Sequence, residues 1–278
     1  MRYLLVTLLF LGTIVQAQDA KRFPLSYPNG IGKDIFGLAK EPFKNKKKTA
    51  IQLGVFTAAS FTLYQFDDEI QAWSQSIKSH SLNEWSEYVF EPVGAGVYPL
   101  AVAGGMAVGG LLFKNEAILE TSVVSIESFL VAGLMSRIPK LIFGRRRPHF
   151  EGTPIKNEFL GPMLGGHDNF KSWLKHYSAS SHSAYVSGHT TAAFALMTAF
   201  AEQYRKYNDG WVVPALCYTV AGISGVSRLY DNKHWATDVL GGACLGYITA
   251  KYLVNNHHWE IRPFVQGEAR GIGFSIQI

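Results

Sequence analysis

The sequence of 278 residues is poor in cysteine and in the residue spacings that hold metal ions. Its two cysteines, Cys217 and Cys244, lie in apolar stretches, and no Cys-x-x-Cys pair occurs. These features argue against a disulfide framework and against a structural zinc site. We expect both thiols to behave as small hydrophobic side chains.

Charged residues are also scarce. They make up 17% of the chain, against 47% apolar residues, and the formal net charge of +5 comes without a long basic tract or a nucleic-acid-binding motif. We therefore assign the excess positive charge to local anion-binding sites and one lysine cluster, and we exclude a nucleic-acid surface. A chain of this length can bury a sizeable core in one domain, or at most two.

Residues 1–17 have the pattern of a secretory signal peptide. Arg2 precedes an apolar run over residues 4–15, and the small-residue sequence VQA ends at Ala17. The run is short for a membrane span, although a short anchor is the alternative reading. The pattern predicts export, to the periplasm or to the cell-envelope membrane. Residues 18–48 form a lysine-rich segment, compatible with an amphipathic segment on anionic lipid or with a solvated run of charge.

The apolar pattern of residues 49–256 predicts an all-α domain that forms a bundle of about six core helices. The expected helices cover residues 49–65, 93–113, 116–143, 187–205, 211–226 and 237–253. Only the stretch 93–113 is both long and free of charge, so the sequence leaves open whether the bundle spans a membrane.

Three further segments complete this organisation. The acidic residues 67–92 predict short helical turns, and residues 144–186 form a connection long enough to indicate a functional role. Residues 257–278 alternate apolar and polar side chains around glycines, which predicts a short extended or hairpin tail.

Residues 227–238, SRLYDNKHWATD, combine an arginine, a histidine and an aspartate at useful spacings. If the chain is helical from about His234, then His234 and Asp238 lie one turn apart on one face. A carboxylate there orients the imidazole and leaves its other nitrogen free to attack. Arg228 is a permanent cation suited to phosphate-like oxyanions. The alternative is a surface arginine, a buried histidine and an aspartate at a helix entry.

Lys140 and Arg147 bracket the end of the helix expected over residues 116–143. A lysine supplies a mobile point charge, and an arginine can bind two oxygens at once. The alternative is a basic helix end favoured by the helix dipole, and we interpret Arg145 and Arg146 in this way.

The segment Ser187-Gly188-His189 opens another expected helix. Serine is a good N-cap, glycine lets the backbone approach an anion, and the free amides of the first turn favour negative charge. His189 then lies where it can protonate a leaving group. The alternative is a capped helix with an incidental histidine.

Taken in order, these three segments resemble the signature of the type 2 phosphatidic acid phosphatase and vanadium haloperoxidase superfamily, in its bacterial envelope phosphatase branch. The signature is Lys-x6-Arg-Pro, Ser-Gly-His and Ser-Arg-x5-His-x3-Asp, running from Lys140 to Asp238. One departure is visible, because the family usually has proline where this chain has Val186. The resemblance implies an all-helical bundle with its active site at helix ends.

The resemblance also implies a role for each matched residue. His234 would be the nucleophile that forms a phosphohistidine, Asp238 would orient it, and His189 would act as general acid and then as general base. The residues implied in phosphate binding are Lys140, Arg147, Ser187, Gly188 and Arg228. No metal ligand or other cofactor is implied, since phosphoryl transfer needs positioning and charge neutralisation, which cations and a helix N-terminus supply.

The sequence therefore predicts a metal-independent phosphatase acting on a phosphomonoester or pyrophosphate. The expected partner is a phosphate-bearing lipid, at a membrane surface or in the bilayer. A soluble periplasmic acid phosphatase for small phosphoesters is one alternative. Another is a vanadium-dependent haloperoxidase, in which vanadate would be the cofactor. A catalytically inactive binding protein is disfavoured because every residue with an implied role is present. The sequence does not determine the oligomeric state.

Overall fold

The computed structural model describes residues 29–149, 156, 158–159 and 182–256, and the backbone of residues 260–266 and 269–275. The expected signal peptide, the start of the lysine-rich segment and most of the connection 144–186 lie outside the described residues. The helices are α2 (Asn29–Lys44), α3 (Lys46–Gln65), α4 (Asp67–Ser76), α5 (His80–Trp85), the π-helical turn η1 (Ser86–Phe90), α6 (Glu91–Gly94), α7 (Val97–Leu112), α8 (Glu116–Met135), α9 (Arg137–Phe143), α11 (Gly188–Tyr207), α12 (Val212–Tyr230) and α13 (Ala236–Asn256).

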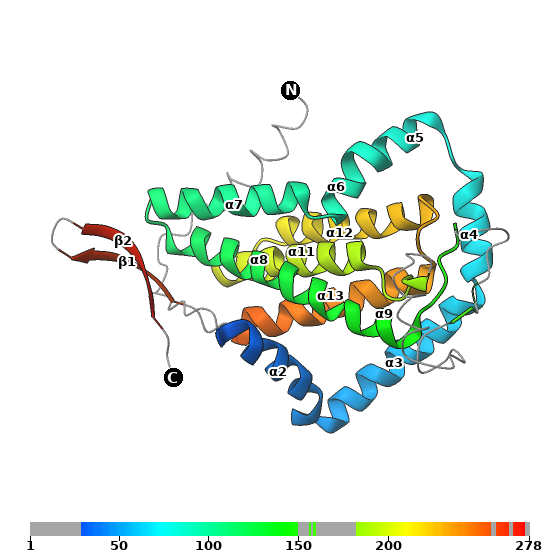
Figure 1. Ribbon diagram of the computed structural model, residues 1–278, viewed down its shortest axis with the longest axis horizontal. Helices are drawn as coiled ribbons and strands as arrows, with labels where there is room; N and C mark the ends of the chain where they lie inside the picture. Colours follow the sequence, from blue (N-terminus) through cyan, green and yellow to red (C-terminus); the bar gives the residue numbers. More distant parts are fainter. Residues whose placement is uncertain are drawn as a thin grey trace, which may run out of the picture.

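The predicted all-α bundle is confirmed. Helix α11 is its centre and packs against α8, α12 and α13, while α7 packs against α8 (Figure 1). Helices α2 and α3 meet at an angle at the edge of the bundle, and α4 and α5 lie at one end (Figure 1). The predicted C-terminal hairpin is present as antiparallel strands β1 (Glu260–Gln266) and β2 (Ala269–Ser275).

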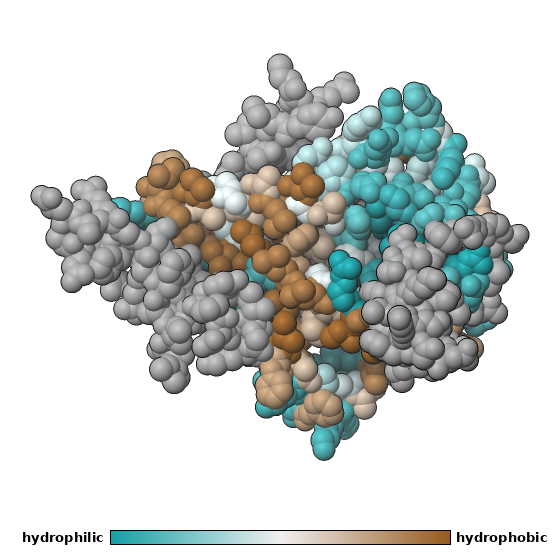
Figure 2. Space-filling view, viewed as in Figure 1, coloured by the Kyte–Doolittle hydropathy of each residue, from teal (hydrophilic) through white to brown (hydrophobic). Residues whose placement is uncertain are grey.

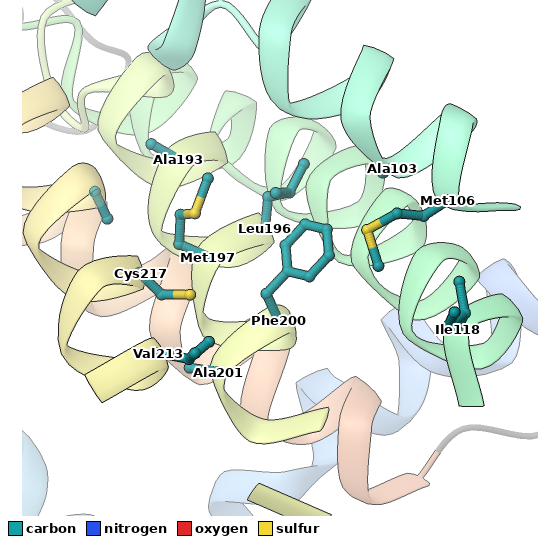
Figure 3. Packing of buried hydrophobic residues seen from close by; sticks show 11 residues of the cluster. Ala103, Met106, Ile118, Ala193, Leu196, Met197, Phe200, Ala201, Val213 and Cys217 are labelled. Atoms are coloured by element: carbon teal, nitrogen blue, oxygen red, sulfur yellow. The ribbon is translucent and has the colours of Figure 1, made fainter. Parts of the chain in front are cut away.

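The core lies between α11 and the helices α7, α8 and α12. Leu196 and Phe200 of α11 pack with Met106 of α7 and Cys217 of α12 (Figure 3). Cys217 is buried, Cys244 is half-buried, and both are free thiols. Cys217 therefore fits the expected role of a small hydrophobic side chain better than Cys244 does.

Two helix boundaries follow from local chemistry. The helix expected over 116–143 is interrupted at Ser136, between α8 and α9. Pro139 has no amide hydrogen to donate to the carbonyl of Met135, so the ladder cannot run through this point. The second helix ends at Phe143 because Gly144 follows with a left-handed φ of 53°, which glycine adopts without strain.

The acidic segment forms the predicted short helical turns α4, α5, η1 and α6. By contrast, α3 has no buried residue although its sequence is largely apolar. On the face shown in Figure 2, a hydrophobic band crosses α7 and α8, and the region over α4 and α5 is hydrophilic. Ile51, Leu53, Val55 and Phe61 of α3 are each more than half exposed, and exposed apolar side chains of this kind suit a lipid environment.

Within the part of the chain that the structure describes, two helical stretches are long and apolar enough to cross a membrane, namely Glu116–Phe143 and Val212–Tyr230. A third qualifies if His80–Gly94 and Val97–Leu112, which meet at a bend of 49°, form one broken span. The charge-free run predicted over 93–113 is therefore too short as a helix to qualify alone, since α7 has 16 residues.

Glycine allows α13 to approach α11 closely. A Cβ added to Gly246 would overlap the carbonyl oxygen of Thr191 and lie 2.9 Å from the amide nitrogen of Ala195. We expect Gly246→Ala to lower the free energy of unfolding by about 1–3 kcal/mol through overpacking. Gly222→Ala is the matched control, because a Cβ there meets no atom within 4 Å. Chemical denaturation in detergent measures both, and equal stability of the two variants would contradict this packing.

Candidate active site

The three predicted segments converge on one cavity of about 320 Å³ at an end of the bundle. Six of the eight predicted site residues line it: Lys140, Arg147, Gly188, His189, Arg228 and His234. The other two, Ser187 and Asp238, lie behind the lining and are fully buried. Segments separated by about ninety residues in the sequence therefore form a single site, as their combined pattern predicts.

The start of α11 contributes a helix N-terminus to the cavity. The hydroxyl oxygen of Ser187 accepts hydrogen bonds from the amide and the hydroxyl of Thr190, at 3.4 Å and 2.9 Å. Ser187 is therefore the N-cap, as the sequence predicts. The amides of Gly188 and His189 occupy the first turn, where a helix supplies no internal acceptor, so they are available to an anion. Val186, in the expected proline position, is buried.

Three predicted cations surround this helix start. Lys140 Nζ donates to the carbonyl oxygen of Ser183 at 2.6 Å, and Arg147 Nη2 donates to the hydroxyl of the same serine at 3.1 Å. Arg228 is fully buried at the end of α12, and its Nη2 lies 2.8 Å from Asp231 Oδ2. Each cation is therefore held by one or two groups of the chain while it faces the cavity.

His234 and Asp238 are paired as expected, with a different local structure. Helix α13 begins at Ala236, so His234 lies just before it. The side chain of Asp238 reaches back to cap this turn, and its Oδ2 accepts from the amide of Trp235 at 2.8 Å. The same Oδ2 lies 3.6 Å from His234 Nδ1. This is an ion-pair distance and longer than a hydrogen bond.

Both histidines are neutral at physiological pH. Burial lowers the pKa of His234 to about 3, Asp238 acts in the opposite direction, and Lys140 adds to the lowering. Burial also lowers the pKa of His189 to about 4, and the neighbouring Arg228 contributes to this shift. A neutral imidazole has a free lone pair, so His234 is in the protonation state that a nucleophile needs.

Further charged residues lie in or beside the cavity that the motifs did not single out. Arg137 and Lys233 line it. Lys233 Nζ lies 3.0 Å from Glu91 Oε1, and the same oxygen lies 3.7 Å from Arg228 Nη1. In the sequence, Lys233 stands out only because it precedes His234. A surface lysine could occupy the same position, so no local pattern identifies Lys233 as a cavity residue.

Arg145 corrects the sequence interpretation. It was expected to be a basic helix end, but it is 1% exposed and its guanidinium pairs with Asp238 Oδ1 and Asp67 Oδ2, at 2.8 Å and 2.7 Å. Arg146 lies nearer the surface and pairs with Glu158 at 2.7 Å. Adjacent arginines have the same sequence signal, and only the tertiary structure separates the buried one from its neighbour.

Among the residues that the structure describes, no group of three or more His, Cys, Asp or Glu side chains has the arrangement of a metal site. The cavity instead presents five cationic side chains, two neutral histidines and a helix N-terminus. Convergent cations and a helix N-terminus are the groups with which proteins bind phosphate-like anions.

Comparison with known proteins places the chain in a family. Residues 122–262, about half of the chain, match the model of the PAP2 superfamily, and the chain belongs to that family. Over 123 residues it is 42% identical to the lipid A 1-phosphatase of Porphyromonas gingivalis. That alignment covers 42% of this chain and 27% of the relative, so the chain spans about a quarter of the relative's length.

Two solved structures resemble the fold. One is the first transmembrane PAP2 type phosphatidylglycerolphosphate phosphatase from Bacillus subtilis, with a TM-score of 0.47 and 19% identity over 81% of this chain and 92% of that one. The other is LpxE of Aquifex aeolicus, with a TM-score of 0.46 and 17% identity over 67% of this chain and 93% of that one.

The buried neutral state of His234 predicts a pH-dependent stability. The unfolded chain binds a proton at this histidine near its ordinary pKa of about 6.5, whereas the folded chain binds it only near a pKa of about 3. The free energy of unfolding therefore falls as the pH is lowered through this window, by about 3 kcal/mol between pH 7 and pH 4.

Denaturation of His234→Gln at a series of pH values measures this contribution. The variant should show a shallower loss of stability with falling pH than the unsubstituted chain. His80→Gln is the matched control, because the side chain of His80 is 90% exposed, and it should retain the original slope. An unchanged slope in His234→Gln would show that the histidine is not buried in its neutral form.

Proposed function

We propose that this chain is a metal-independent phosphatase that hydrolyses a lipid-linked phosphomonoester or pyrophosphate through a phosphohistidine. The observation that carries the proposal is the placement of His234. It is 3% exposed, neutral, paired with Asp238, and lines the same cavity as His189 and the cations. A neutral imidazole beside convergent positive charge is the arrangement that nucleophilic attack on phosphorus requires.

Binding is the task of the cations and the start of α11. Lys140, Arg147 and Arg228 neutralise the phosphoryl oxygens, while the Gly188 amide adds a hydrogen bond. Ser187 supports this turn as the cap of the helix. Spreading the positive charge over three side chains and a helix dipole favours the charge distribution of the transferring phosphoryl group.

In the first chemical step, the free ring nitrogen of His234 attacks phosphorus. A P–N bond forms as the P–O bond to the leaving group breaks, and His189 donates a proton to the departing oxygen. A bound phosphate dianion neutralises Arg228 and adds negative charge beside His189, and both effects raise the pKa of this histidine toward the value that a general acid needs.

In the second step, water attacks the phosphohistidine. His189 accepts a proton from the water, the P–N bond breaks, and inorganic phosphate leaves with His234 restored to its neutral form. Asp238 stabilises the positive charge that develops on the imidazole when the P–N bond exists. His189 thus donates one proton in the first step and regains one from water in the second. Neither step requires a metal ion or another cofactor.

A lipid carrier for the phosphate is supported by the surface of the chain. Among the described residues, two stretches are long and apolar enough to cross a membrane, and α3 exposes apolar side chains without burying any. The aligned relative is named for a lipid phosphate. We propose that the chain works in the cell-envelope membrane after export. The alternative of a small soluble phosphoester as substrate predicts a different outcome in the experiment below.

The test is turnover by the purified chain in detergent with EDTA present, using dioctanoyl phosphatidate, farnesyl diphosphate and glucose 6-phosphate. We expect phosphate release from one or both lipid substrates and little from the sugar phosphate. His234→Ala should lower kcat by about 10⁴-fold, since it removes the nucleophile, and the exposed His80→Ala should leave it unchanged.

His189→Ala should cost most on substrates whose leaving group is a poor one, because such leaving groups need the proton. Loss of activity with EDTA, or near-normal turnover by His234→Ala, would contradict the proposal. Preferred turnover of glucose 6-phosphate would favour the soluble acid phosphatase. Bromide oxidation with vanadate and peroxide, without phosphate release, would favour the haloperoxidase, in which His234 would bind vanadate.

A further inference from the structure

A buried triad of charges lies behind the cavity, formed by Asp67 of α4, Arg145 and Asp238. Arg145 Nη2 donates to Asp67 Oδ2 at 2.7 Å, and Arg145 Nη1 donates to Asp238 Oδ1 at 2.8 Å. All three side chains are at most 1% exposed. Neither Asp67 nor Arg145 lines the cavity among the described residues, so neither is placed to touch a substrate.

Asp67 also binds the first turn of α13 directly. Its Oδ1 accepts from the amide of Thr237 at 3.0 Å, and its Oδ2 accepts from the hydroxyl of Thr237 at 2.6 Å. Arg145 Nη1 donates to the oxygen of the same hydroxyl at 2.6 Å. Asp67 and Arg145 therefore fix both the side chain of Asp238 and the backbone immediately before it.

The guanidinium of Arg145 is held from its remaining sides as well. Its Nε donates to the carbonyl oxygen of Lys156 at 2.9 Å. The rings of Trp235, Tyr64 and Phe159 have their centroids 5.2 Å, 5.3 Å and 5.6 Å from its central carbon. A cation enclosed in this way has one orientation, so the carboxylate that it binds has one orientation too.

We propose that Asp67 and Arg145 are positioning residues for the nucleophile: they fix the carboxylate of Asp238, and through it the imidazole of His234, and they set how much negative charge reaches that imidazole. This inference rests on the proposed function for its effect on turnover. Asp67 lies outside residues 122–262, which match the family model, so the family match does not assign it a role.

The cost of burying charged groups favours this positioning role over a purely structural contact between helices. Burying charged groups is unfavourable because they lose their hydration, and apolar residues of similar volume hold two helices together at least as well. Here the buried charges converge on the one carboxylate that lies 3.6 Å from His234. Buried charges that lower stability and lie around a group next to the reacting atoms are typical of a functional site.

Several charged or titratable groups face His234 and Asp238. They are Asp67 from α4, Lys140 from α9, Arg145 and Arg147 from the segment after it, and Tyr185 from the segment before α11. Removing the positive charge of Arg145 leaves Asp238 with more uncompensated negative charge, which favours the protonated form of His234. Removing the negative charge of Asp67 does not have this effect, because Arg145 then acts on Asp238 alone.

The test compares Arg145→Gln and Asp67→Asn with matched neighbours. Arg146→Gln and Asp68→Asn make the same chemical changes one residue away, at side chains that pair with Glu158 and Lys156 nearer the surface. The readouts are kcat, KM and the acid limb of kcat/KM for dioctanoyl phosphatidate in EDTA, between pH 3 and pH 8. Circular dichroism and thermal unfolding show whether each variant folds.

Both triad variants should lower kcat by about 10- to 100-fold, as loss of an orienting partner typically does, with KM changed less than about threefold because the phosphate-binding cations remain. Arg145→Gln should also move the acid limb upward by about one pH unit or more, whereas Asp67→Asn should not raise it. Both neighbour variants should stay within about twofold of the unsubstituted chain.

Triad variants with kcat near the original value, or with lower kcat but no upward shift of the acid limb in Arg145→Gln, would overturn the inference. If Arg145→Gln does not fold, Arg145→Lys replaces it: the charge is kept but the planar bridge is lost. Its kcat should then fall with the acid limb unmoved, and a normal kcat would overturn the inference.

A readout without turnover separates this inference from the proposed function. Nuclear magnetic resonance of ¹⁵N-labelled histidine rings follows protonation of His234 directly. Arg145→Gln should raise the pH at which this ring titrates, and Arg146→Gln should not. If the unsubstituted chain hydrolyses none of the substrates, the proposed function fails, while an unchanged His234 titration in Arg145→Gln would overturn the triad's role independently.

Discussion

The burial of the Asp238 carboxylate is the constraint on which the site depends. A buried carboxylate needs a partner on each oxygen, and here Arg145 serves Oδ1 while the Trp235 amide serves Oδ2. The backbone carbonyl of Asp238 also accepts the amide of Ser187 at 2.9 Å. One residue therefore links the start of α13, the start of α11 and His234, so the hydrogen bonds of a single buried carboxylate connect most of the elements around the cavity.

Charge balance explains the rest of the cavity. Arg228 is partly offset by the carboxylate of Asp231 at the end of the same helix, and Lys233 by that of Glu91. Lys140 and Arg147 instead bind neutral oxygens of Ser183. The cavity thus retains a positive excess that a phosphate dianion reduces, and the burial of its histidines keeps them neutral in the absence of that dianion.

The sequence predicted the bundle, and the eight residues that it singled out lie in or directly behind one cavity, because both the helices and the motifs have local signals. Apolar runs predicted the helices, and Lys140, Ser187 and His234 belong to spaced motifs at helix ends. Arg145 and Asp67 had no such signal: Arg145 is one of three adjacent arginines, and Asp67 is one of several acidic residues in its segment. Their place behind the cavity depends on burial and on contacts over long sequence separations, which no local pattern encodes. The single helix expected over residues 116–143 is broken at Ser136, because Pro139 removes the hydrogen bond to the carbonyl one turn upstream.

The central claim is that His234 attacks phosphorus, and trapping the intermediate tests it most directly. The chain is mixed with ³²P-labelled dioctanoyl phosphatidate, quenched in alkali within milliseconds, digested and analysed by mass spectrometry. A phosphoryl group bound to nitrogen is stable in alkali and labile in acid. The account predicts this label on the peptide that contains His234, and its absence in His234→Ala. Label on another residue, or turnover with no covalent label under conditions in which hydrolysis of the intermediate is slowed, would contradict it.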